Sequence, residues 1–301
     1  MSIRELCRPR PETFLDTVRT FDESKFIVFG APMDLTGTYR RGSRFAPGAI
    51  RRASRYMESY SLRLDLDGED IPICDVGDLE SKGDVNEWLL RIEKAIHDIT
   101  RDEKTPIMMG GEHTITLGAL RALKQAAIVD FDAHFDLRNE FLGTMLSHAT
   151  FLRRSLEERK RPTIVLGARA LSKEELAYAR EIDYMTARQI SKNKPEENLE
   201  AVLNLLPKEM PVYITVDMDA LDPSEAPAVC NPAPEGISFS KALDILQGIC
   251  VRRTVLGIDL CEVTPYYDSG LTSIQAAKLL LELILASHKG RTGIDVPEQR
   301  G

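Results

Sequence analysis

Three side chains that can bind a metal alternate with other residues near the middle of the chain. Asp132, His134 and Asp136 follow a short apolar run that begins at Ala127. In an extended chain alternate side chains point to the same side, so two carboxylates and one imidazole are directed toward one point. Like charges held this close repel each other unless a cation lies between them. The spacing therefore predicts a metal site.

Two further segments offer ligands of the same kind. Asp217 and Asp219 are also two residues apart and follow an apolar run. His113 comes two residues after a pair of glycines, which permit a sharp turn at the end of another apolar run. Asp222, in the same segment as Asp219, is interpreted as a turn residue because Pro223 follows it.

Together these residues predict a centre that holds two ions. Four carboxylates balance the charge of two divalent cations, and a donor set rich in oxygen and without a thiolate suits Mn²⁺ better than a structural zinc site. A pair of ions about 3.5–4 Å apart can hold a bridging hydroxide at neutral pH, which is a design for hydrolysis. The six candidate ligands are His113, Asp132, His134, Asp136, Asp217 and Asp219.

Two residues outside the ligand set can take part in catalysis. His148 follows a long loop and can move protons to a leaving group. Taken alone, a histidine at the start of a helix is more often structural. Glu262 ends another apolar run and is not needed as a ligand, so its carboxylate can pair with a cationic substrate.

The elements that must position these residues alternate along the chain. Short β-branched runs alternate with amphipathic stretches, which predicts a parallel sheet with helices on both faces. No repeat or low-complexity linker interrupts the pattern, so we expect one domain over residues 1–301. The expected strands are 26–29, 71–75, 106–109, 127–132, 163–166, 212–216 and 254–259, with a weaker one at 182–185. The expected helices are 47–59, 84–101, 114–124, 148–159, 173–181, 195–206, 239–249 and 270–288.

Two long connections are predicted to be functional loops. Residues 135–147 and 217–237 each follow the carboxyl end of an expected strand. Loops of this length in a compact domain are usually functional, and open α/β sheets bind ligands at that edge.

The composition limits the classes of partner. A net charge of −8 argues against a nucleic-acid partner and is better matched to a small cationic substrate. The five cysteines form no CxxC pair, and the N-terminus lacks a basic-then-apolar signal. The longest apolar stretch, residues 279–286, is too short to span a bilayer. We therefore expect a cytoplasmic protein with reduced thiols and no membrane partner.

With these residues in place, the sequence resembles the ureohydrolase family of arginases and agmatinases over nearly its whole length. Each block is moderately specific, and all of them in order are very specific. The matching blocks are Gly110-Gly-Glu-His113, Asp132-Ala-His-Phe-Asp136, Asp217-Met-Asp-Ala-Leu-Asp-Pro223 and Glu262-Val-Thr-Pro265, with the N-terminal segments 30–34, 42–50 and 75–78.

The resemblance implies a three-layer α/β/α fold with a parallel sheet of eight strands and two Mn²⁺ ions per subunit. It implies hydrolysis of a guanidino group to urea and an amine by a metal-bridging hydroxide. His148 would then be the proton shuttle and Glu262 the partner of the guanidinium group. It also implies a homo-oligomer, a trimer or a hexamer.

The substrate favoured by the resemblance is agmatine, whose hydrolysis yields putrescine for polyamine biosynthesis. Residues 136–140 and 147–150 look more like agmatinases than arginases. Arg138 can bind a carboxylate, so arginase, guanidinobutyrase and formimidoylglutamase activities stay open, and Glu140 and Glu235 are candidates to receive a distal ammonium group. A non-catalytic binding module whose metals stabilise an oligomer is a more distant alternative.

Overall fold

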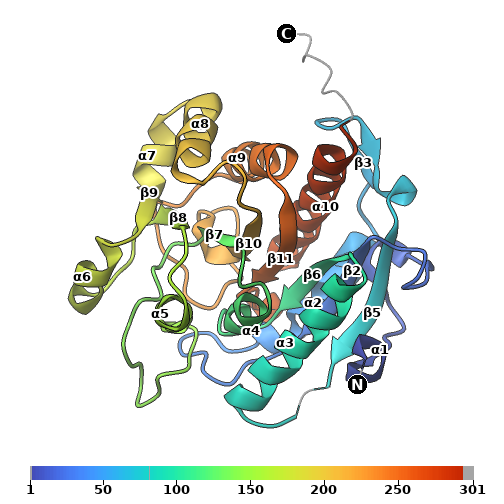
Figure 1. The fold of residues 1–301 in the computed structure, drawn as a ribbon, viewed down its shortest axis with the longest axis horizontal. Coiled ribbons are helices and arrows are strands. Elements are labelled where there is room, and N and C mark those ends of the chain that lie inside the picture. Colours follow the sequence, from blue (N-terminus) through green and yellow to red (C-terminus); the bar gives the residue numbers. More distant parts are fainter. Residues whose placement is uncertain (1, 81, 294–301) are drawn as a thin grey trace.

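A computed structural model describes residues 2–80 and 82–293, which are built around one nine-stranded sheet (Figure 1). The strand order is β1-β5-β2-β6-β11-β10-β7-β8-β9. Eight of these strands run parallel, as expected. They are β2 (Phe26–Ala31), β5 (Ile73–Leu79), β6 (Thr105–Gly110), β7 (Ala127–Phe131), β8 (Thr163–Ala168), β9 (Asp183–Thr186), β10 (Val212–Asp217) and β11 (Val255–Cys261).

The ninth strand corrects the expected count of eight. β1 (Cys7–Arg8) pairs antiparallel with β5 at the edge of the sheet, with Cys7 opposite Leu79 and Arg8 opposite Asp78. A strand of two residues is too short to carry a hydrophobic period, so the sequence pattern could not reveal it.

Helices cover both faces of the sheet (Figure 1). Alternate strand residues point to opposite faces, so Val28 belongs to one core cluster and Phe29 to the other. The first face packs against α2 (Ala46–Ser54), α9 (Phe239–Arg252) and α10 (Leu271–Thr292), and the second against α3 (Val85–Arg101), α4 (Ile115–Ala122) and α5 (Phe151–Glu158). The remaining elements are the helices α1 (Ile3–Leu6), α6 (Leu176–Ala179), α7 (Ala187–Lys192) and α8 (Pro195–Leu205) and the strands β3 (Tyr60–Ser61) and β4 (Leu66–Asp67).

Local sequence explains where several helices begin and end. Asp84 caps α3 by accepting a hydrogen bond from the N–H of Glu87, and Ser238 caps α9 in the same way. The helix expected at 173–181 is instead a 3₁₀ turn, Lys173–Glu175, followed by the four residues of α6. The helix expected at 148–159 begins only at Phe151.

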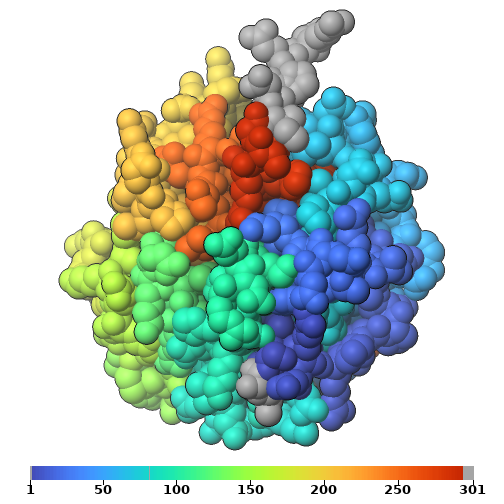
Figure 2. Space-filling view, turned by 45° about the vertical axis from the view of Figure 1, so that its right-hand side comes forward, coloured from blue at the N-terminus to red at the C-terminus, as the bar shows by residue number. Residues whose placement is uncertain are grey.

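The N-terminal and C-terminal parts of the chain lie side by side. α10 packs against α2, and Figure 2 shows the red C-terminal segment beside the blue and cyan N-terminal segments. No helix within residues 2–80 and 82–293 is long and apolar enough to cross a membrane.

The parallel arrangement brings the expected site residues to one edge of the sheet. Strands that run in the same direction have their carboxyl ends together, and four neighbouring strands, β6, β11, β10 and β7, end where the motifs begin. Asp217 lies opposite Cys261 on the next strand, and Val216 lies opposite Phe131. Asp132, Asp217 and Glu262 are therefore neighbours in space although the sequence separates them.

Candidate metal centre

Asp132 lies between two histidines at this edge of the sheet. Its Oδ2 is 3.1 Å from Nδ1 of His113, and its Oδ1 is 3.5 Å from Nδ1 of His134. The two oxygens of one carboxylate therefore belong to two different clusters of potential ligands. This arrangement allows Asp132 to bridge two ions.

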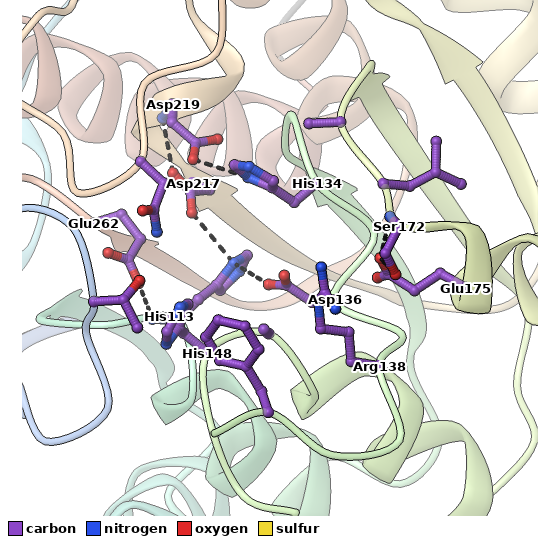
Figure 3. A pocket seen from close by; sticks show the side chains of 16 residues that line it. His113, His134, Asp136, Arg138, His148, Ser172, Glu175, Asp217, Asp219 and Glu262 are labelled. Carbon is purple, nitrogen blue, oxygen red and sulfur yellow. Dashed lines mark hydrogen bonds and ion pairs between the residues drawn. The ribbon is translucent and has the colours of Figure 1, made fainter. Parts of the chain in front are cut away.

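The first cluster surrounds His113, which is fully buried. Besides Asp132, Nδ1 of His113 lies 3.4 Å from Oδ2 of Asp136 and 3.5 Å from Oδ2 of Asp217 (Figure 3). Its Nε2 lies 2.8 Å from the hydroxyl of Thr215. That contact orients the ring so that Nδ1 points toward the three carboxylates, as is usual for a metal-ligating histidine.

The second cluster contains His134 and Asp219 in addition to Asp132. Nδ1 of His134 is 3.1 Å from Oδ2 of Asp219. The backbone fixes both aspartates of this segment, because Oδ1 of Asp217 accepts a hydrogen bond from the N–H of Asp219, and Oδ1 of Asp219 accepts one from the N–H of Ala133. In each case the other oxygen is left to face the histidines.

The donor atoms fit divalent cations. Nδ1 of His113 and Oδ2 of Asp132 are buried and make no hydrogen bond. Burial raises the pKa of Asp136 to about 7 and the pKa of Asp217 well above its usual value. Burial lowers the pKa of His134, but the carboxylates of Asp219 and Asp132 raise it by a larger amount. The net pKa of His134 is therefore well above its usual value. In the metal-free protein, protons thus take the place of the positive charge that bound ions would supply.

One thiol lies beside the first cluster, where the sequence indicated none. Sγ of Cys261 is within 4.8 Å of donor atoms of His113 and Asp217. Burial raises the pKa of this thiol well above its usual value, and its S–H donates to the carbonyl oxygen of Val216 at 3.6 Å. Cys261 is therefore a neutral neighbour of an oxygen-rich donor set.

Glu262 is held rigidly next to the same cluster. Its N–H donates to the carbonyl oxygen of Gly111 at 2.8 Å, and its Oε1 accepts from the N–H of His113 at 2.7 Å. Its φ of 66° is unusual for a residue other than glycine and is typical of a functional position. Oε2 is buried without a hydrogen-bond partner, and burial raises the pKa of the carboxyl to about 8. One oxygen thus anchors the side chain and the other is left for a cation.

His148 reaches the site from the segment before α5. Its ring packs edge-on against Phe141, with the ring centroids 5.5 Å apart, and its Nδ1 lies 3.1 Å from the hydroxyl of Thr36. Burial lowers the pKa of the ring, so the imidazole is neutral at physiological pH.

A cavity of about 340 Å³ opens above these groups, and Figure 3 shows the candidate residues around it. Five of the six proposed ligands line it together with His148 and Glu262, while Asp132 lies beneath, fully buried. Glu140 and Glu235 are not among its lining residues.

Sequence reasoning missed several lining residues on the outer wall, among them Thr38, Phe141, Ser172, Glu175 and Asn231. Phe141 and Asn231 lie in the two long connections, Thr38 and Ser172 lie in other irregular segments, and Glu175 ends a 3₁₀ turn. None of these segments has a hydrophobic period that could have singled out the lining side chains.

Comparisons with known proteins agree with this geometry. The model of the arginase family matches residues 24–286. The N(1)-aminopropylagmatine ureohydrolase of Thermococcus kodakarensis is 36% identical, with 89% of this chain and 92% of that protein covered. The agmatinase of Bacillus cereus is 34% identical, with coverages of 91% and 96%.

Among solved structures, the agmatine ureohydrolase of Thermoplasma volcanium superposes with a TM-score of 0.88 at 35% identity. The match covers 95% of this chain and 98% of that one. The chain therefore belongs to the arginase family, as an enzyme of its agmatinase-like ureohydrolase branch.

Proposed function

We propose that this protein is a manganese-dependent agmatinase, which converts agmatine and water into putrescine and urea. The observation that carries the proposal is the position of the free Oε2 of Glu262 beside two ligand clusters that share Asp132. A guanidinium group requires a carboxylate partner, and its hydrolysis requires a strong nucleophile. Both requirements meet in one cavity.

The proposed ligands are divided between two ions. The first ion would be held by His113, Asp132, Asp136 and Asp217. The second ion would be held by Asp132, His134 and Asp219. Asp217 is close enough to both His113 and Asp219 to be shared between the two ions. When bound, two Mn²⁺ ions supply a hydroxide nucleophile near neutral pH.

The residues of the chain supply orientation and protons. Glu262 binds the planar guanidinium group through its free oxygen and presents the central carbon to the nucleophile. The neutral imidazole of His148 takes up the proton that the attacking water releases and delivers it to the nitrogen that leaves as putrescine. The bond from carbon to that nitrogen breaks, and the new carbon–oxygen bond remains in urea.

The outer wall of the cavity supports a substrate whose far end is cationic. Glu175 and Arg138 both line the cavity, but Arg138, which could have received a carboxylate, is already paired with Glu174 at 2.9 Å. This pairing weakens the case for guanidinobutyrate and arginine. The similarity to an N(1)-aminopropylagmatine ureohydrolase makes that longer polycation a second candidate.

Urea release with added Mn²⁺ tests the proposal. Agmatine, N(1)-aminopropylagmatine, arginine and guanidinobutyrate are compared at equal concentration, with formimidoylglutamate assayed for formamide. The highest kcat/KM is expected for agmatine. A higher value for aminopropylagmatine would reassign the substrate, and no product from any of the five would favour the binding module. We also propose a trimer or hexamer, which sedimentation of the metal-loaded protein measures.

A further inference from the structure

Glu112 is fully buried and precedes the proposed metal ligand His113 in the sequence, and its hydrogen bonds go to the loop at 35–37 and to Thr114. Its carboxylate receives five hydrogen bonds. The donors are the N–H groups of Leu35, Thr36 and Gly37 at 2.7, 2.6 and 3.1 Å and the hydroxyls of Thr36 and Thr114 at 2.7 Å each. A group that only accepts is a carboxylate anion. Glu112 therefore ties the loop at 35–37 to the start of α4.

The hydroxyl of Thr36 connects Glu112 to His148. Its oxygen lies 2.7 Å from Oε1 of Glu112, 3.1 Å from the backbone nitrogen of His148 and 3.1 Å from Nδ1 of the His148 ring. The hydroxyl has one proton, and Glu112 can only accept it. The hydroxyl oxygen must consequently accept from the backbone N–H and from the ring Nδ1 of His148, and these two hydrogen bonds use both of its lone pairs.

This count of protons determines the tautomer of His148. A neutral imidazole carries one N–H, and here that proton has to be on Nδ1 because the Thr36 oxygen has no second proton to donate. The other ring nitrogen, Nε2, then has the free lone pair. Among the described residues, Nε2 has no hydrogen-bond partner, and the ring lines the cavity.

We propose that Thr36 and Glu112 are positioning residues that hold His148 in the Nδ1–H tautomer, with Nε2 available to the cavity. Neither residue exchanges a proton in the reaction. The proton that moves is bound and released at Nε2, while Nδ1–H, the Thr36 hydroxyl and the Glu112 carboxylate keep their states. This inference rests on the proposed function, because it assigns His148 a proton to transfer.

A double-mutant cycle tests the link. Thr36→Val and His148→Ala are made singly and together, and kcat and KM are measured with Mn²⁺ on whichever substrate the wild type hydrolyses fastest. Thr36→Val is expected to lower kcat by about 10- to 100-fold with KM and bound Mn²⁺ unchanged. In the His148→Ala background the same change should alter kcat by less than about threefold, because the residue it acts through is gone.

Two controls separate positioning from simple loss of structure. Thr36→Ser keeps the hydroxyl and should restore at least half of the wild-type kcat. Thr272 is a fully buried threonine that donates to Asp268 and accepts from the N–H of Ala228, and within the described part of the chain no hydrogen bond joins it to a histidine. Thr272→Val should lower the thermal midpoint and leave kcat unchanged. If Thr36→Val is insoluble, Thr36→Ala replaces it in the cycle.

The possible results distinguish failure of this positioning role from failure of the proposed function. Equal losses from Thr36→Val in both backgrounds, or no loss in either, would overturn the positioning role while agmatine hydrolysis stands. If the wild type releases no urea or formamide, the proposed function itself has failed.

Discussion

At the residue scale, the two oxygens of Asp132 face different histidines, so one substitution should affect both ions. Asp132→Ala is expected to remove bound Mn²⁺ and reduce urea release to background, because each cluster loses a ligand. Elemental analysis of the dialysed protein measures the metal.

Asp222→Ala is the matched control for Asp132→Ala. The carboxylate of Asp222 accepts from Ser224 within a turn, as its position before Pro223 indicated, and from the N–H of Gly236, which is distant in the sequence. This variant should retain both ions. Undiminished turnover by a metal-free Asp132→Ala protein would refute the two-metal centre.

His148→Ala should separate proton transfer from metal binding. The imidazole contacts Thr36 and Phe141 and belongs to neither ligand cluster. We expect both ions to stay bound while kcat falls by about 10²- to 10⁴-fold, the range for a general acid or base. Loss of an ion in the purified variant would instead show that His148 is a ligand.

The spacing of Asp132, His134 and Asp136 could be interpreted from the sequence because a period of two residues has a direct meaning in an extended chain. The role of Glu112 could not, since its partners lie about 75 residues earlier in a loop without periodicity. Cys261 was missed for a related reason: only the pairing of β10 with β11 brings it beside Asp217.

At the element scale, Gly111 sets how closely the turn after β6 can approach the N-terminal loop. A Cβ on Gly111 would lie 1.9 Å from the carbonyl oxygen of Met33, and that atom is backbone, which cannot rotate away. Gly111→Ala should therefore lower the free energy of unfolding by about 3 kcal/mol or more. Chemical denaturation of the metal-free protein measures this change.

Gly143→Ala provides the comparison for Gly111→Ala. Gly143 has a φ of +80° but nothing within 4 Å of the position of a Cβ. Its substitution should cost only the backbone strain, about 1 kcal/mol. Equal costs at the two glycines would show that the close approach to Met33 is relieved by movement of the loop.

The elements differ in how well their sequences predict them. The eight parallel strands are recognisable because most are continuous buried apolar runs. β5 extends to Leu79, beyond the expected end at residue 75, because Arg51 pairs with Asp75 and Asp78 and stabilises a segment whose Gly77 suggests a turn. Short elements such as α1 and α7 have too few residues to show a period.

At the scale of the whole molecule, the site should make the metal-free protein less stable as pH rises from 5 to 8. Burial raises the pKa of Asp136 to about 7 and of Glu262 to about 8, so both bind protons in the folded state after the unfolded chain has lost them. The folded state then holds more protons, and stability falls with rising pH. Burial lowers the pKa of His134, yet Asp219 raises it by more, so the net pKa is well above its usual value. Above about pH 6.5 folded His134 therefore holds a proton that the unfolded chain has lost, and this also makes stability fall as pH rises. His148, whose pKa burial lowers, opposes the trend only below that pH.

Thermal unfolding of chelator-treated protein at pH 5 and pH 8 measures this effect. Mn²⁺ should raise the midpoint more at pH 8, because the ligands must lose their protons to bind it. A metal-free protein that is more stable at pH 8 than at pH 5 would contradict the assigned direction of these pKa shifts.

The hydrogen bonds that join Glu262 to His113 and Gly111 also bear on how this enzyme could change. They fasten Glu262, the proposed partner of the guanidinium group, to the proposed ligand His113 at the end of β6, so the binding of one end of the substrate depends on the sheet. We expect the other end to face loop residues such as Ser172 and Asn231, which lie outside the strands. Insertions or exchanges in those loops can thus alter which molecules are accepted while the reaction stays the same, and new substrates become accessible to evolution without reassembly of the metal site.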